Sequence, residues 1–157
     1  MAKKLLIAAL VLVVACLMLA ACNGDDKSYS ADRFDVDLAV QPDGSLIVAE
    51  TVDFRFEGGP FTFVFRDLAF NEIDGIDRLQ ATMDGEALPQ GTGPGQVEIQ
   101  AGDPLQVTWH LPPTSNATRS FELTYRVQGA VRQMEDSDAL IWRAIPEEHD
   151  YEIASST

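Results

Sequence analysis

Residues 46–56 read LIVAETVDFRF, and their alternation decides the fold class. The even positions carry apolar side chains with the exception of Glu50, whereas most odd positions carry polar or small ones. A period of two is the period of a β-strand that buries one face. We therefore predict a half-buried strand over 46–56, with its even positions facing a core.

The preceding residues turn this strand into a hairpin. The stretch FDVDLAV at 34–40 alternates in the same way, and PDGS at 42–45 separates the two strands. Pro42 fixes φ and Gly44 accepts a positive φ, so both residues favour a turn. The sequence thus predicts a β-hairpin.

The rest of the chain repeats short apolar stretches between turns rich in glycine, proline and aspartate, and no segment shows a sustained helical period. Such a series is typical of an antiparallel β-sandwich, so we predict an all-β fold. An immunoglobulin-like architecture is one option by analogy only, because the cysteine pair of antibody domains is absent. Further strands are expected at 61–65, 77–83, 96–100, 105–111, 121–127 and 139–145, with a loop at 112–120.

The N-terminus has the pattern of an export signal. Lys3 and Lys4 precede an unbroken apolar run at 5–21, which is about 25 Å long as a helix and short for a membrane span. The residues LAAC at 19–22 resemble the lipobox of bacterial lipoproteins, in which the chain is cut before a cysteine that is acylated. The resemblance implies that Cys22 becomes the lipidated first residue of the mature chain. The alternative is an uncleaved N-terminal transmembrane anchor.

These readings divide the chain into a signal peptide of the lipoprotein type at 1–21, a flexible tether at 22–33 and a β-sandwich domain at 34–157. Either anchor leaves the domain outside the cytoplasm, because the two lysines lie on the inner side of the membrane. Stable attachment needs more than one acyl chain on Cys22, since a single chain binds reversibly. The final YEIASST reads as the middle of a strand, so we expect a truncated domain.

Charge and cysteine content restrict the partners and the sources of stability. Removal of 1–21 leaves nine basic and 25 acidic residues, a net charge of −16 against −14 for the whole chain. An acidic surface of this kind repels nucleic acids and favours cationic groups, metal ions, neutral glycans or other proteins as partners. Cys16 and Cys22 both precede the domain, so packing rather than a disulfide must stabilise it.

Glu50 is the most informative polar residue, because it occupies the apolar face of its strand. Burial of a carboxylate costs free energy unless the group is paired and hydrogen-bonded. We predict a structural ion pair between Glu50 and Arg66, which follows a phenylalanine-rich strand; Arg119 is the second choice of partner. Two other readings, exposure through strand twist and a ligand-binding or catalytic carboxylate, stay open.

Catalytic and metal-binding patterns are weak. His110 is expected to face water, His149 lies in an acidic stretch, and no nucleophile motif accompanies either histidine. We therefore predict a domain that is not an enzyme and holds no cofactor or metal, although 25 acidic residues leave room for a glycosidase-type carboxylate pair. The spacing of a calcium-binding EF-hand loop is not met, which leaves only a looser acidic cluster of Asn71, Glu72, Asp74 and Asp77.

The two tryptophans bear on a glycan-binding alternative. Trp109 and Trp142 share parity with apolar neighbours, which predicts core positions. If exposed, they would instead offer an aromatic platform for sugars.

Several motifs, in order, resemble one bacterial family. They are PDGSLIVAETVDFRF at 42–56, FVFRDL at 63–68, RSFELTYRVQGAV at 119–131 and LIW at 140–142. Together they are similar to the extracytoplasmic N-terminal domain of the DUF2207-type predicted membrane proteins, over roughly residues 30–157. The resemblance implies a β-domain behind a signal, followed in known members by transmembrane helices and a low-complexity cytoplasmic tail. This chain departs from that pattern in its lipobox and in ending before a second membrane segment.

We therefore predict a non-catalytic binding domain outside the cytoplasm, anchored to the membrane by lipid on Cys22. Its expected partner is another envelope protein or the membrane part of a larger assembly, and not a nucleic acid. The alternative is an envelope carbohydrate-active or metal-binding domain that uses surface carboxylates. Exposed tryptophans or a pocket of convergent carboxylates would favour that alternative.

Overall fold

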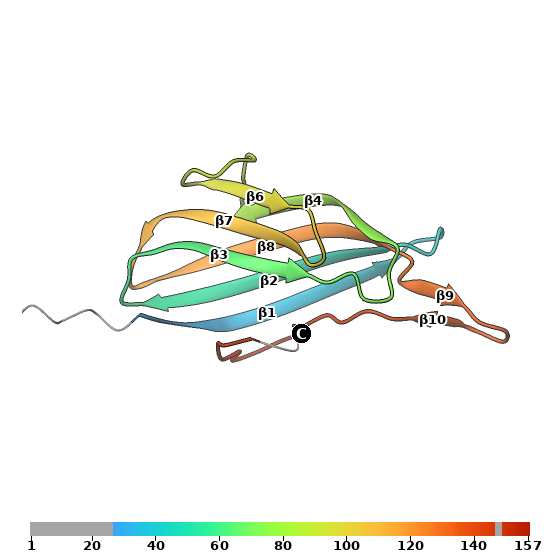
Figure 1. The fold of residues 1–157 in the computed structure, drawn as a ribbon. Coiled ribbons are helices and arrows are strands. Elements are labelled where there is room, and N and C mark those ends of the chain that lie inside the picture. Colours follow the sequence, from blue (N-terminus) through green and yellow to red (C-terminus); the bar gives the residue numbers. More distant parts are fainter. Residues whose placement is uncertain (1–26, 147–148) are drawn as a thin grey trace, which may run out of the picture.

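The protein forms two β-sheets that enclose a common core (Figure 1). The structure is a computed structural model, and it describes residues 27–146 and 149–157. These residues contain no helix, in agreement with the all-β prediction. One sheet has the order β1 (Ser28–Val40), β2 (Leu46–Glu57), β8 (Ala117–Gln128), β4 (Gly75–Met83) and β5 (Glu86–Ala87). The other has the order β3 (Phe61–Leu68), β7 (Leu105–Thr114) and β6 (Gln96–Gln100).

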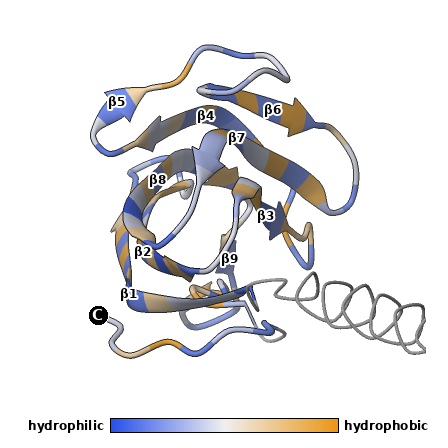
Figure 2. Ribbon diagram, turned by 90° about the vertical axis from the view of Figure 1, so that its left-hand side faces the viewer, coloured by the Kyte–Doolittle hydropathy of each residue, from blue (hydrophilic) through white to orange (hydrophobic). Residues whose placement is uncertain are grey.

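Alternation along the strands builds the core. In β2 every even residue from Leu46 to Phe56 is buried, and every odd residue is partly or fully exposed. Figure 2 shows hydrophobic and hydrophilic colours alternating along strands that curve round this interior. Burial of large apolar side chains contributes about 1.5–3 kcal/mol each, so it is the main source of stability. In β8 the same pattern buries Phe121, Leu123, Tyr125 and Val127, as their spacing predicts.

The loop predicted at 112–120 is wrong for most of its length. β7 runs to Thr114 and β8 begins at Ala117, so the connection is only two residues long. Pro112 and Pro113 fit at the end of β7, because its pairing with β6 has stopped before them and its pairing with β3 is irregular there.

The flexible tether predicted at 22–33 is wrong in its second half. β1 begins at Ser28 and pairs with β2 over almost its whole length, up to Val40. A register shift after Ala31 breaks the side-chain alternation, which hides the first half of the strand from a search for period two. The predicted signal peptide, Cys22 and the rest of the chain up to residue 26 lie outside the described residues.

The apolar face of β1 is covered at one end only. Phe34 is buried and Val36 is partly buried, but Leu38 and Val40 are 42% and 55% exposed. The half-buried strand predicted at 34–40 therefore holds for its first half. Beyond it the face has no opposing layer.

The chain after residue 128 forms a small hairpin and then crosses the open side of the sandwich. The hairpin pairs β9 (Val131–Gln133) with β10 (Asp138–Leu140). The strand predicted at 139–145 is wrong beyond Leu140, because the chain leaves the ladder there and packs Trp142 and Ile145 against the core. No helix in the described part of the chain is long and apolar enough to cross a membrane.

The last residues lie beside β1 and run parallel to it. Ala31 N donates to Glu152 O at 2.8 Å, and Phe34 N donates to Ser155 O at 2.9 Å. Val36 N donates in the same way to the carbonyl of Thr157. The C-terminal residues thus satisfy backbone groups along the outer edge of the five-stranded sheet.

Candidate functional site

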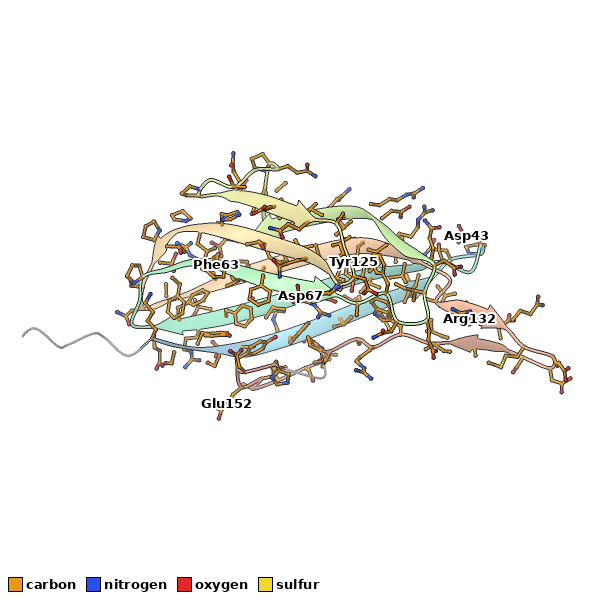
Figure 3. All side chains as sticks on the ribbon, viewed as in Figure 1. Asp43, Phe63, Asp67, Tyr125, Arg132 and Glu152 are labelled. Carbon is orange, nitrogen blue, oxygen red and sulfur yellow. The ribbon has the colours of Figure 1, made fainter. Side chains whose placement is uncertain are left out.

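A buried polar network joins the two sheets. Glu50, on the inner face of β2, is 3% exposed. Arg66 of β3 donates to it twice, from Nε to Oε2 at 2.8 Å and from Nη2 to Oε1 at 2.9 Å. The hydroxyl of Tyr125, from β8, donates to Oε1 at 2.6 Å. Tyr125 is 1% exposed, and Figure 3 labels its position.

The electrostatics of this network fix its protonation state. Burial raises the pKa of Tyr125, and the adjacent Glu50 carboxylate raises it further. Burial acts to lower the pKa of Arg66, but the hydrogen bonds and the charge of Glu50 outweigh it, so this pKa is raised. The phenol therefore stays a neutral donor and the guanidinium stays charged. The arrangement is an ion pair with a supporting hydrogen bond, and it holds β3 to the five-stranded sheet.

The second candidate partner for Glu50 lies elsewhere. Arg119 donates from Nη1 to Asp84 Oδ2 at 2.7 Å on the surface. Glu50 is hidden from solvent, so neither strand twist nor an open ligand site describes it. The structure brings Glu50 and Arg66 together and leaves Arg119 apart.

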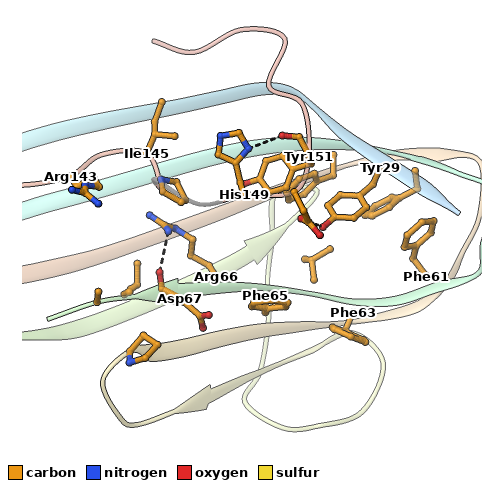
Figure 4. Close-up of a pocket in the computed structure, with 18 of the residues that line it drawn as sticks. Tyr29, Phe61, Phe63, Phe65, Arg66, Asp67, Arg143, Ile145, His149 and Tyr151 are labelled. Carbon is orange, nitrogen blue, oxygen red and sulfur yellow. Dashed lines mark hydrogen bonds between the residues drawn. The ribbon is translucent and has the colours of Figure 1, made fainter. Parts of the chain in front are cut away.

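A long groove runs beside β3 (Figure 4). It has a volume of about 1080 Å³ and extends from Pro60 to Glu72 on one side. The opposite side is the crossing segment, of which residues 141–146 and 149–151 are described. Its lining is rich in aromatic residues, which include Tyr29, Phe54, Phe56, Phe61, Trp142 and Tyr151.

Aromatic contacts shape one end of the groove. The Tyr151 ring lies 5.0 Å from the Phe54 ring, edge to face, and 5.6 Å from the Tyr29 ring. The hydroxyl of Tyr29 donates to Asp150 Oδ1 at 2.6 Å. Burial, and then Asp150, raise the pKa of Tyr29 to about 12. These rings form a fixed apolar wall with few free polar groups.

The outer face of β3 also carries exposed aromatic rings. A register shift separates Phe61 from Phe63, so Val64 and Arg66 point inward. Phe63 and Phe65 point outward and are 54% and 55% exposed. Single exposed apolar residues are common, but these two phenylalanines lie two positions apart on one face of β3, beside the groove.

The histidines and tryptophans take separate places. His110 lies on the outer face of β7, where its Nε2 is 3.0 Å from Glu98 Oε2. His149 borders the groove, and its Nδ1 lies 2.7 Å from the carbonyl oxygen of Tyr151. Trp109 is buried, and its indole donates to the carbonyl of Thr82 at 3.0 Å. Trp142 is partly buried and packs against the core, so both tryptophans take the inward positions that their parity predicts.

The looser acidic cluster that the sequence leaves open, Asn71, Glu72, Asp74 and Asp77, is not assembled as a metal site in the described part of the chain. Asp77 forms two hydrogen bonds with Arg126, which lower the pKa of its carboxyl. The described residues contain no group of three or more histidine, cysteine or acidic side chains placed to hold a metal ion. The groove itself was not predicted, because its second wall comes from a crossing segment whose position no local pattern encodes.

Comparison with known families matches residues 30–157 to the family described as predicted membrane protein (DUF2207), N-terminal domain. No curated protein matches the chain. The match includes every strand of the structure, apart from the first two residues of β1. It confirms the resemblance carried by the 42–56 hairpin and the 119–131 motif. The chain therefore belongs to the DUF2207 family of predicted membrane proteins, of which it contains the N-terminal domain.

Proposed function

We propose that this chain is a non-catalytic binding domain, held on the outer side of a bacterial membrane by lipid on Cys22. The observation that carries the proposal is the aromatic groove between β3 and the crossing segment. A groove of about 1080 Å³ is large enough for a peptide or a large ligand, and its apolar wall provides contact area.

The polar groups of the groove support binding rather than catalysis. Asp150 accepts a hydrogen bond from Tyr29, and Asp67 accepts one from Gln106. Arg66 is held by Glu50. Groups engaged in this way are held in position, whereas an acid–base catalyst needs a group that is within reach of the reacting atoms and able to exchange a proton.

The distance to the anchor supports a position close to the membrane. Lys27 lines the groove, and it follows Cys22 by five residues. An extended chain of that length spans at most about 18 Å. Because β1 begins at Ser28, the link is shorter than a tether of residues 22–33 would be. The partner we propose is another envelope protein, or the membrane part of a larger assembly.

Site-specific cross-linking in the producing cells tests this function. A photoreactive phenylalanine analogue would replace Phe63 or Phe65 in the full chain, and Val40 would be the matched control at the far end of β1, since it is equally exposed. We expect discrete adducts from the two β3 positions and none from Val40. Equal labelling at all three positions, or no adducts at all, would refute a binding surface at β3.

A second candidate is glycan binding by the outer face of β3, β7 and β6. Phe63 lies opposite His110, and Phe65 lies opposite Thr108, which is buried. The accessible polar groups beside the two rings are therefore His110 and its neighbour Glu98. Rings beside hydrogen-bonding groups suit sugars. Calorimetry with soluble peptidoglycan fragments tests this candidate, because a Phe63→Ala and Phe65→Ala double variant should abolish any binding of this kind. Absence of binding to the unaltered chain would dismiss it.

A further inference from the structure

One side of β3 is an open strand edge. Among the described strands, β3 is hydrogen-bonded to β7 alone. The corresponding edge of β1 is covered, because the C-terminal residues accept hydrogen bonds from Ala31, Phe34 and Val36. Unpaired strand edges are normally protected by charges, prolines or a covering segment, since they can pair with another chain. β3 has a single acidic and a single basic residue, and Pro60 precedes it.

The direction of the free backbone groups follows from the neighbouring strands. In β6, Val97 N donates to Pro89 O, and Val97 O accepts from Gly91 N. The backbone of Val97 therefore faces away from β7, and its neighbours on either side form the bonds to β7. These neighbours, Gln96 and Glu98, lie opposite His110 and Thr108 of β7. The even residues of β7 therefore bond to β6, and its odd residues bond to β3.

The same alternation identifies the groups on the open edge of β3. Val64 and Arg66 lie opposite odd residues of β7 and bond to them. The N–H and C=O groups of Phe63, Phe65 and Asp67 consequently point to the open side. The hydrogen bond from Arg66 Nη1 to Asp67 O, at 3.0 Å, agrees with this direction. At least two successive donor and acceptor pairs, those of Phe63 and Phe65, thus have no backbone partner among the described residues, at the spacing of a β-ladder.

The groove provides room for a strand along this edge. It borders the whole of β3, Phe61–Leu68, a length of about 26 Å for eight strand residues. On its far side lie Trp142 and Ile145, which are only partly buried. A strand placed there would pair with β3 through its backbone and insert alternate apolar side chains between the two walls.

Charge indicates which kind of chain would bind. The protein has a net charge of −14, so a second copy would be repelled, whereas a basic segment would be attracted. Asp67, Glu72 and Asp150 line the groove. The arginines and lysine that line it are Arg66, which Glu50 neutralises, Lys27 and Arg143, so the attraction of a basic segment comes from the net charge of the whole protein. Lys27 Nζ lies 5.6 Å from the centre of the Phe61 ring and donates to Pro60 O at 2.8 Å. One end of the groove thus already holds a lysine through an aromatic ring and a backbone carbonyl, the contacts that a lysine of a partner would use.

We infer that the open edge of β3 binds an extended, net-basic segment of another polypeptide as an added strand, with its apolar side chains in the groove. The inference rests on the proposed binding function and specifies its partner. It requires that the contact be made through backbone hydrogen bonds and not through side chains alone.

Peptides with altered backbones test the inference. The parent probe is a ten-residue peptide of alternating valine and lysine, added to the full chain in detergent micelles and measured by fluorescence anisotropy. Two derivatives carry N-methyl groups on all valines or on all lysines. A strand uses one set of its amides to pair, so we expect one derivative to lose about tenfold in affinity and the other to bind like the parent. No binding of the parent, or equal binding of the two derivatives, would overturn the inference.

Two variants of the protein provide a matched control on the other side of the contact. Phe65→Pro removes the outward N–H and the ring, but it leaves the hydrogen bonds to β7. Phe65→Ala removes the ring alone. We expect Phe65→Pro to weaken the parent peptide about tenfold, and Phe65→Ala to weaken it about threefold or less. Equal losses from both variants would mean side-chain recognition and would overturn the inference; if Phe65→Pro does not fold, the methylated peptides still decide it.

The remaining outcomes separate this inference from the proposed function and from other occupants. An acidic peptide with glutamate in place of lysine should bind at least about tenfold more weakly at low salt, and equal binding would refute the basic partner. If the full chain self-associates, and Phe65→Pro abolishes this association whereas Phe65→Ala does not, the strand that occupies the groove belongs to a second copy. Cross-linked adducts at Phe63, together with peptide binding that N-methylation does not weaken, would leave the binding function intact and refute strand addition.

Discussion

Glu50 interrupts the apolar face of β2, and this interruption predicts a buried ion pair. It is the single charged side chain on the buried face of β2, and it is satisfied by Arg66 and Tyr125. Because the two charges lie on different sheets, their pairing also positions β3, the strand that borders the groove. An ion pair at this depth is costly to break from one side, since the remaining charge has no water to replace its partner.

Substitution of Glu50 or Arg66 should therefore destabilise the fold far more than loss of an ion pair on the surface. We expect Glu50→Gln to lower the free energy of unfolding by about 3 kcal/mol, because Arg66 would stay buried without a counter-charge. The control is Arg119→Gln, which breaks an exposed pair with Asp84 and should cost less than about 1 kcal/mol. Urea denaturation measures both. Similar values for the two variants would show that the buried pair has no special role.

The tyrosines offer a second measurement at the residue scale. All three are held protonated: burial and then Asp150 raise the pKa of Tyr29 to about 12, and burial raises the pKa of Tyr125 and of Tyr151. Spectrophotometric titration of the folded chain should show the tyrosines ionising above pH 10, the ordinary value. The unfolded chain loses these protons first, so the free energy of unfolding should fall as pH rises above 10. A normal titration step at pH 10 in the folded chain would contradict this burial.

At the scale of elements, alternation predicts those strands that bury one regular face. The strand β2 is predictable almost to its ends, because each of its even residues faces the core. In β8 the alternation predicts 121–127 but misses the first four residues, which begin at Ala117 and lie outside the regular buried pattern. The Glu50–Arg66 pairing could be named from the same pattern. The first half of β1 could not, because the register shift after Ala31 interrupts its alternation.

The groove was beyond sequence reasoning for a different reason. The described residues of its second wall, 141–146 and 149–151, form no regular strand, and the position of this wall depends on where the chain crosses the finished sandwich. The apolar side chains at 139–145 predict a strand that is hydrogen-bonded to a neighbour. In the structure, Trp142 and Ile145 contact the core without one.

Pairing of the C-terminal residues with β1 gives a prediction for an element. Ala154 N donates to Ala31 O at 2.8 Å, and this donor is absent from a proline. We expect Ala154→Pro to speed amide exchange at Ala31 and Phe34, whose acceptors belong to the same segment, while the amides of β8 stay protected. Ala154→Gly retains the N–H and is the control. Unchanged exchange at Ala31 in the proline variant would show that the segment does not depend on this pairing.

For the whole molecule, the family and the fold place a β-domain in a predicted membrane protein, and the lipid anchor is our proposal for how this chain is attached. Lys27, the first described residue, follows Cys22 by only five residues, so lipid on Cys22 would hold the groove close to the bilayer. The acidic surface would keep the domain away from anionic headgroups and open to basic partners.

The anchor has its own test. We expect Cys22→Ala to abolish labelling by a fatty-acid analogue and the processing of the signal peptide in bacterial cells, because the acylated thiol would be missing. Cys16→Ala, which changes the other cysteine, is the control and should be labelled normally. Labelling that persists in Cys22→Ala would remove the lipoprotein assignment and favour an uncleaved anchor.

Amide exchange of the full chain, measured with and without the basic peptide, shows whether a partner strand pairs with the open edge of β3. The amides of Phe63 and Phe65 point to the open side, whereas that of Val64 bonds to β7 and serves as an internal control. We predict that the peptide slows exchange at Phe63 and Phe65 at least about tenfold and leaves Val64 unchanged. Bound peptide with unchanged exchange at both phenylalanine amides would contradict the account.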